Sequence, residues 1–170
     1  MANQDSPHGF PSVASLNGRP GYFRNYAKAV GYGTAVGYND LVDSAASGID
    51  IERGAAGGPF LGISYAYSAA STAATHPVEI LHFDNIVEGQ TDGSLVAADT
   101  GLKADIVVAA ANATTGISAM EIDASTEAAT ATLDLYLLRL APYADNAAGT
   151  NSRWFCNVHD LRLSTVVAGE

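Results

Sequence analysis

The chain has few charged residues and very few basic ones. Charged side chains make up 15% of its 170 residues, against about 25% in an average globular protein. Eight lysines and arginines stand against 18 acidic residues, which gives a formal net charge of −10, and the basic residues are scattered. Because nucleic-acid binding needs clustered lysine and arginine to displace counterions, this distribution argues against direct contact with DNA or RNA. A surface with few charges favours packing against other protein.

Cysteine and long apolar runs are scarce as well. Cys156 is the only cysteine, so no disulfide can form within the chain. It stands in an apolar run over 153–158, where we expect a buried, small hydrophobic side chain. No apolar stretch approaches the roughly 18 residues that suggest a membrane span, and the first residues lack the basic and apolar regions of a signal peptide. We therefore expect a protein that is made in a reducing cytoplasm and contacts no membrane.

Proline and glycine are concentrated at the start of the chain. Regular structure is disfavoured by Pro7, Gly9, Pro11, Gly18, Pro20 and Gly21. We predict an extended N-terminal arm over 1–21, followed by a single β-rich domain over 22–170. Phe10, Val13 and Leu16 are apolar anchors spaced along the arm. An arm of this composition is ordered only where it docks, either on its own body or on a neighbouring subunit.

The rest of the chain consists of short β-like runs separated by glycine and small polar residues. We predict strands at 22–30, 36–43, 49–53, 60–67, 77–88, 104–109, 118–123, 131–141 and 153–163, and one helical turn within 97–102. Large and small residues alternate over 60–67, which indicates close approach of another backbone to the small face. The 131–141 run is apolar on both faces, as is typical of a central strand. The predicted fold is all-β, with a β-barrel or sandwich-like body and little helix.

Motifs that would indicate an enzyme are incomplete. Gly62-Ile63-Ser64 begins a hydrolase-like Gly-x-Ser-x-Gly pattern, but Ala66 stands where the last glycine belongs. His82 and Asp84 are two residues apart on an expected strand and could give two metal ligands, but such pairs are common by chance. We therefore predict a protein that is not an enzyme, with no catalytic residue, no cofactor and no metal site.

Three stretches carry a resemblance through their order and spacing. The first is Met1-Ala2-Asn3-Gln4-Asp5-Ser6-Pro7-His8-Gly9-Phe10-Pro11 followed by Leu16-Asn17-Gly18, and the second is Gly57-Gly58-Pro59-Phe60-Leu61-Gly62-Ile63. The third comprises 99–106, 114–126, 131–133, 137–140, 145–146 and 151–154. Together they resemble the head decoration, or cement, proteins of tailed phages. The resemblance covers most of the chain but not 22–48, and the residues after Asn157 depart from the family pattern.

The resemblance implies a structural virion protein on the outer surface of the capsid. It implies that the partner is the major capsid protein, bound where capsid subunits meet, that the protein is a homotrimer, and that it stabilises the shell. We expect the capsid or subunit interface to include Phe10, Pro11, Val13, Leu16, Tyr22 and Phe23. The sequence leaves open the symmetry axis that is occupied and the choice between barrel and sandwich.

A carbohydrate- or host-binding β module of a virion fibre or adhesin is the main alternative. It predicts an exposed aromatic platform, with Tyr65, Tyr67 or Tyr143 as candidates. A hydrolytic enzyme would need a convergent polar pocket that these residues do not suggest. A head–tail joining or tail-tube protein is a further alternative, although such proteins have basic or lumen-facing features that this chain lacks.

Overall fold

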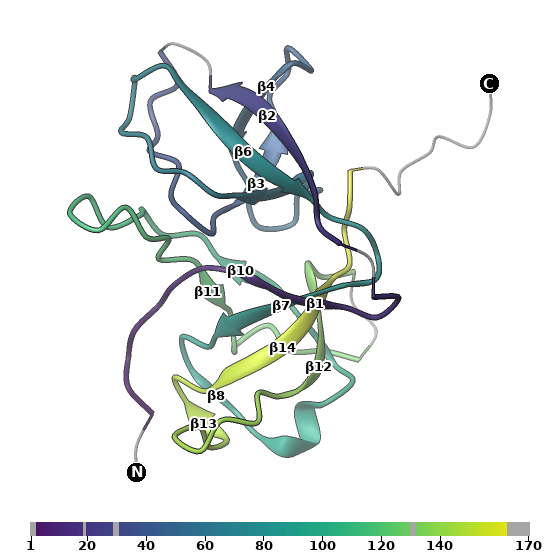
Figure 1. Cartoon of the computed structure of the whole chain (residues 1–170). Helices are drawn as coiled ribbons and strands as arrows, with labels where there is room; N and C mark the ends of the chain where they lie inside the picture. Colours follow the sequence, from purple (N-terminus) through teal and green to yellow (C-terminus); the bar gives the residue numbers. More distant parts are fainter. Residues whose placement is uncertain (1–2, 19, 29–30, 130–131, 163–170) are drawn as a thin grey trace.

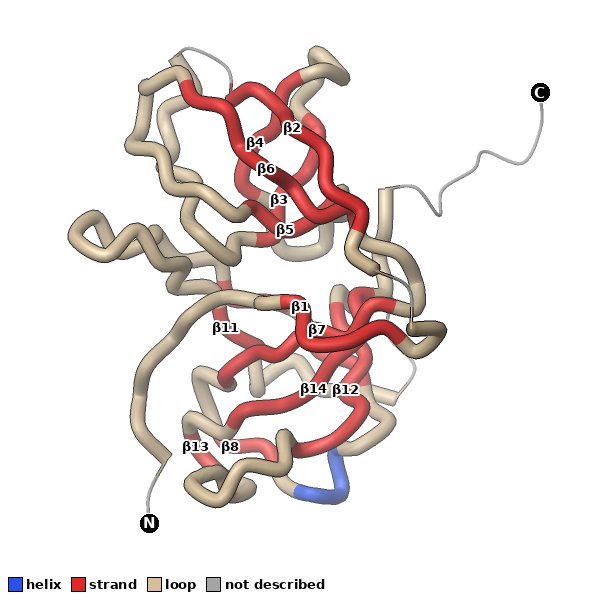
Figure 2. The backbone as a smooth tube through the Cα atoms, viewed as in Figure 1, coloured by secondary structure: helices blue, strands red, loops and turns tan. Residues whose placement is uncertain are grey.

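The chain folds almost entirely into β-strands. The structure is a computed structural model that describes residues 3–18, 20–28, 31–129 and 132–162. Its strands form a closed five-stranded barrel, a five-stranded sheet and two small two-stranded sheets (Figures 1 and 2). One 3-10 turn, η1 (Ala97–Asp99), is the only helical element among the described residues, and it lies within the predicted helical turn. The all-β prediction is confirmed.

The barrel contains the first half of the chain after the arm. Its strands are β2 (Tyr22–Lys28), β3 (Leu41–Ser44), β4 (Asp50–Arg53), β5 (Gly62–Ser64) and β6 (Ala74–Ile80), closed in the order β2-β4-β3-β5-β6. Only the β2–β4 pair is parallel. A Cβ atom added at Gly62 would lie 2.2 Å from the carbonyl oxygen of Glu79, so the predicted close backbone approach in the 60–67 run is confirmed.

The five-stranded sheet contains most of the second half of the chain. Its order is β1 (Ser12–Ser15), β7 (Asn85–Gln90), β14 (Arg153–Val158), β12 (Leu135–Leu140) and β9 (Lys103–Ala104), and every neighbouring pair is antiparallel. The small sheets pair β10 (Ile106–Val107) with β11 (Glu121–Ile122) and β8 (Ser94–Leu95) with β13 (Gly149–Thr150). Along β14, Trp154 and Cys156 point into the core, which confirms the expected burial of the cysteine.

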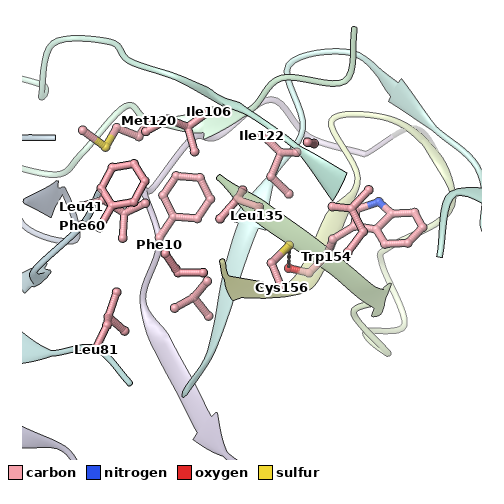
Figure 3. Close-up of a cluster of buried hydrophobic side chains, with 14 of the residues drawn as sticks. Phe10, Leu41, Phe60, Leu81, Ile106, Met120, Ile122, Leu135, Trp154 and Cys156 are labelled. Atoms are coloured by element: carbon pink, nitrogen blue, oxygen red, sulfur yellow. Dashed lines mark hydrogen bonds between the residues drawn. The ribbon is translucent and has the colours of Figure 1, made fainter. Parts of the chain in front are cut away.

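One hydrophobic cluster joins the barrel to the sheet. It includes Leu41 and Phe60 from the barrel region and Trp154 from the sheet, and Phe10 of the arm belongs to the same cluster (Figure 3). Phe10 is fully buried, and the missing side chain of Gly89 makes room for it, because a Cβ atom there would lie 2.5 Å from the Phe10 ring. Barrel and sheet therefore share a core in which an arm residue is packed.

The prediction of one strand over 77–88 is wrong. Strand β6 ends at Ile80 and β7 begins at Asn85, and these two strands lie in the barrel and the sheet respectively. A turn separates them, in which the Asn85 amide donates to the His82 carbonyl oxygen (3.0 Å) and the Asn85 side-chain oxygen accepts from the His82 amide (2.8 Å). The pattern of apolar residues does not predict this turn, because the turn is closed by a hydrogen bond to the side chain of a polar residue, Asn85.

The run at 131–141 is shorter and more open than predicted. Residue 131 lies outside the described residues, and β12 begins at Leu135. Leu135 and Leu137 are fully buried, but Tyr136 on the opposite face is exposed. The strand is central in the sheet, yet only one face is covered. Residues 29–30 and 163, which end two other predicted strands, also lie outside the described residues.

Candidate functional site

The described part of the arm docks on its own body. Residues 1, 2 and 19 of the predicted arm lie outside the described residues. The Phe10 amide donates to the Asn39 carbonyl oxygen (3.0 Å), the Pro11 carbonyl oxygen accepts from the Glu88 amide (3.0 Å), and β1 then pairs with β7. The sequence places Phe10 at an interface with another protein, but the structure places it in the core of this chain. Phe10 and Pro11 therefore hold the arm in place rather than forming a free surface.

A polar network holds the arm where it crosses the sheet. The Nε2 atom of His8 lies 3.3 Å from Glu88 Oε1, and the Tyr143 hydroxyl donates to Glu88 Oε2 (2.5 Å). The hydrogen bond with Glu88 raises the pKa of His8, although burial opposes this. Burial works against ionisation of Glu88, but the hydrogen bonds from His8 and Tyr143 lower its pKa overall. The network thus favours an ion pair between the arm and β7.

A cleft of about 200 Å³ lies beside this network. It is lined by Asn3, Gln4, Ser6, His8, Gln90, Asp145, Asn151 and Arg153. Its buried amide is already engaged, because Gln90 accepts from the Ser6 amide (2.8 Å) and donates to the Gln4 carbonyl oxygen (2.7 Å). These contacts fasten the arm, so the cleft has less hydrogen-bonding capacity for a ligand than its lining suggests.

A groove of about 390 Å³ runs along the outer face of the five-stranded sheet. It is lined by Val13, Ala14, Leu16, Ile86, Leu138, Arg139 and Phe155, and we call it the sheet groove. Two of the predicted interface residues, Val13 and Leu16, lie in it, and both are exposed. The Arg139 guanidinium lies over the Phe155 ring, 5.2 Å from its centroid, and forms none of the ion pairs found among the described residues. The groove is therefore apolar with one cationic edge.

Three aromatic side chains gather on the barrel. Tyr65 makes edge-to-face contacts with Phe23 (centroids 5.2 Å apart) and with Tyr38 (5.3 Å), and we call these three residues the aromatic patch. The Tyr65 hydroxyl donates to Glu79 (2.7 Å), and burial together with this hydrogen bond raises the pKa of the phenol. Phe23 is more than half exposed, so the predicted interface residue does lie on the surface.

Tyr22, the last predicted interface residue, is exposed but lies away from the aromatic patch. Successive strand side chains point to opposite faces, so Tyr22 and Phe23 are on different sides of β2. Tyr22 borders a hollow of about 280 Å³ together with His82 and Asp84. The six predicted interface residues therefore fall in four places: Phe10 and Pro11 beneath the arm, Val13 and Leu16 in the sheet groove, Phe23 in the aromatic patch, and Tyr22 beside the hollow.

The barrel encloses a serine–histidine pair that the sequence did not suggest. Ser64 Oγ lies 2.8 Å from Nδ1 of His76, and the Nε2 atom of the same ring lies 2.9 Å from Ser68 Oγ. Both Ser64 and His76 are fully buried. Burial, and then the charge of Lys28, lower the pKa of His76. The pair has the elements of an activated nucleophile but no access for a substrate, so it acts as a satisfied polar cluster in the barrel.

The His82 and Asp84 pair is not arranged as expected. Both residues lie in the turn between β6 and β7 rather than on a strand, and Asp84 accepts hydrogen bonds from the side chains of Ser15 (3.0 Å) and Asn17 (3.0 Å). No three histidine, cysteine, aspartate or glutamate side chains in the described part of the chain are grouped to hold a metal ion. Asp84 thus serves to hold the end of the arm.

Comparisons with known proteins give no family for this chain. Neither a protein-family model nor a curated protein sequence matches it. Within the described residues, no helix has the length and apolar character needed to cross a bilayer.

Proposed function

We propose that this chain is a decoration protein of a tailed-phage capsid. It binds the outer surface of the shell at junctions between major capsid subunits, stabilises the shell, and has no catalytic role. One observation carries the proposal: the serine–histidine pair in the barrel is enclosed, whereas the apolar sheet groove and the aromatic patch are accessible. The resemblance of the sequence to cement proteins supplies the partner.

The two surfaces suit a protein that must contact both a shell and its own neighbours. Aromatic side chains are enriched where protein interfaces carry most binding energy, so the aromatic patch, led by Phe23, is the proposed shell contact. The sheet groove, with Val13 and Leu16, is the proposed subunit contact of a homotrimer. A shell bound at many equivalent sites gains stability even when each contact is modest.

The charge of the chain agrees with a position outside the shell. A net charge of −10 repels packaged nucleic acid and keeps an exposed protein soluble. The shared core favours a rigid body, because barrel and sheet cannot separate without exposing Phe10 and its neighbours.

The alternative, a carbohydrate- or host-binding module, receives less support from the aromatic side chains. Tyr65 lies in the aromatic patch, Tyr143 lies over the sheet against Phe155 and Arg153, and Tyr67 packs near Gly116. These tyrosines have different neighbours, so they do not make one platform. The rings of the aromatic patch meet at 64° and 86°, which is unlike the flat surface on which a sugar ring stacks.

Co-sedimentation with phage heads that lack their decoration protein tests the proposal. The probes are the purified chain, Phe23→Asp, and Val96→Asp as a matched change at an exposed apolar residue outside both surfaces. We expect saturable binding at a fixed ratio to the capsid protein and greater heat tolerance of the heads. Phe23→Asp should weaken binding about tenfold or more, and Val96→Asp should not.

The opposite results have a clear meaning. Absence of binding to mature and to expanded heads would contradict the decoration role, and a glycan-array signal from the same preparation would move the carbohydrate-binding module to first place. Equal loss of binding in both variants would show that the aromatic patch is not the shell contact.

A further inference from the structure

The sheet groove is apolar and has a positive charge at its edge, so it suits a partner segment that is apolar and carries a negative charge. Its floor comes from side chains on the outer face of β12, β14 and β7, with Leu138 and Phe155 among them. Arg139 at its edge is exposed, its guanidinium lies over the Phe155 ring, and it forms no ion pair with any residue that the structure describes. An apolar side chain followed by a carboxylate would fill the groove and meet this guanidinium.

The hairpin turn between β3 and β4, residues 45–49, displays such a pair. Ile49 is 74% exposed, and no other large hydrophobic side chain among the described residues is more exposed. The turn is closed by its own backbone, since the Ala45 amide donates to the Asp50 carbonyl oxygen and the Gly48 amide to the Ala45 carbonyl oxygen, both at 2.8 Å. An ordered turn that presents isoleucine to solvent has already met much of the entropic cost of binding.

The charge and shape of this turn complement the sheet groove. Asp50 directly follows Ile49 and accepts a hydrogen bond from the Ser47 hydroxyl of the same turn (3.2 Å), and Glu52 lies two residues further along β4. Asp43 on β3 is paired with Arg162 and adds no free charge to this turn. The remaining residues of the turn are alanine, serine and glycine, so the tip is slender. A narrow apolar tip with carboxylates behind it fits a groove of about 390 Å³ with a cationic edge.

The turn cannot reach the groove of its own chain. Asp50 pairs with Ala27 at the end of β2, whereas the other end of β2, at Tyr22, lies where the chain enters from the arm. The hairpin therefore lies at the far end of the barrel from the five-stranded sheet, as Figure 1 shows. We propose that the Ile49 turn of one copy docks in the sheet groove of a second copy, with Asp50 facing Arg139.

Such a contact is head to tail. Each copy then offers one turn and one groove, so the contact repeats until a ring closes or a filament grows. Phe83 is as exposed as Ile49, but it lies beside the groove: the Leu16 amide donates to the carbonyl oxygen of the next residue, Asp84 (2.9 Å). If Phe83 of one copy docked in the groove of a second copy, the grooves of the two copies would have to face each other. The Arg139 side chains of both copies would then lie in the same contact.

Sedimentation of the purified full chain tests this contact without a capsid. The proposed contact does not rest on the decoration role, because the presence or absence of association is measured without phage heads. We expect association that depends on concentration up to about 0.1 mM, and a dissociation constant raised about tenfold or more by Ile49→Asp or by Leu138→Asp. Val96→Asp and Phe83→Ser should associate as the unchanged chain does. Circular dichroism and thermal melting confirm that each variant is folded.

Mixing the two defective variants identifies the geometry. Ile49→Asp retains an intact groove and Leu138→Asp an intact turn, so an equimolar mixture should form a one-to-one complex that neither variant forms alone. Arg139→Asp should weaken association, and adding Asp50→Lys on the same chain should restore it. A monomeric unchanged chain, normal association of Ile49→Asp, loss in Phe83→Ser, or a mixture that stays monomeric would each overturn the proposal.

Discussion

The barrel and the five-stranded sheet are stabilised by different kinds of interior. The cluster that fills the sheet and its junction contains large side chains, with Trp154 and Phe10 among the largest fully buried ones. The barrel interior is built from smaller aliphatic residues such as Val42 and Val78, and it also encloses the polar His76 cluster. The sheet therefore depends on apolar volume, whereas the barrel depends on close backbone packing and on satisfied hydrogen bonds.

The largest expected effect comes from emptying the junction between these two regions. Phe10→Ala should lower the free energy of unfolding by about 3–5 kcal/mol, because the ring is fully buried among residues of both barrel and sheet. Val13→Ala, three residues further along the arm and exposed, should change it by about 0.5 kcal/mol or less. Denaturant unfolding measures both. A small loss for Phe10→Ala would mean that the arm contributes little to the shared core.

Acidity should act at a second link between the two regions. Asp134 accepts hydrogen bonds from the amides of Gly57, on the barrel side, and of Ile106 in β10. Burial raises the pKa of this carboxyl from 3.8 to about 6, and the hydrogen bonds only partly oppose it. The folded chain thus holds the proton more tightly than the unfolded chain, so stability rises as pH falls through about 6 and levels off near the unfolded pKa.

The contribution of Asp134 to the free energy of unfolding has an upper limit and can be removed by substitution. The difference between the two pKa values corresponds to about 3 kcal/mol between full ionisation and full protonation. Asp134→Asn should flatten this part of the stability–pH curve between about pH 7.5 and about pH 4.5, measured by chemical unfolding. An unchanged curve in the variant would show that other groups cause the pH dependence.

The barrel should be sensitive to an added methyl group at one position of its backbone. Gly62→Ala places a carbon 2.2 Å from the Glu79 carbonyl oxygen, which cannot move without shifting β6. The expected loss is about 1–3 kcal/mol of unfolding free energy. Gly33→Ala is the matched control, because nothing lies within 4 Å of its added carbon. Equal stability of the two variants in thermal melting would contradict the close packing of the barrel.

The sequence predicts the kinds of element better than their connections. Alternation of large and small residues is a local property, so the strand at Asp50–Arg53 and the close approach at Gly62 could be predicted. The break at 81–84 could not, because it depends on a side-chain turn by Asn85 and on strands entering different sheets. Burial of Phe10 is also non-local: the space for it is made by Gly89, far along the chain.

The candidate surfaces, too, can be predicted from the sequence only in part. The sequence predicts an interface that includes Val13, Leu16, Tyr22 and Phe23, and all four side chains are exposed. Their separation into the sheet groove, the hollow and the aromatic patch follows from strand alternation and from the pairing of β1 with β7. The serine–histidine pair in the barrel gave no usable signal, because its members are separated by a loop.

The smallest expected effect contrasts a histidine of each region under mild acid. The Glu88 hydrogen bond raises the pKa of His8, so its contribution is full below the unfolded value of 6.5 and is lost as pH rises through the folded value. Burial lowers the pKa of His76, so its contribution is present above 6.5 and is lost as pH falls through the folded value. Acid should therefore tighten the arm on the sheet and loosen the barrel.

Amide hydrogen exchange between about pH 8 and about pH 5, corrected for intrinsic rates, measures both trends. Protection of the Glu88 amide, which donates to Pro11 of the arm, should rise on acidification by about 1 kcal/mol or less. Protection of the amides that join β2 to β6 should fall. His8→Gln should remove the first trend alone, because the hydrogen bond with Glu88 raises the pKa of His8, whereas burial and the charge of Lys28 lower that of His76. Parallel trends in both regions would show that barrel and sheet open together, and the contrast between their interiors would then have no dynamic consequence.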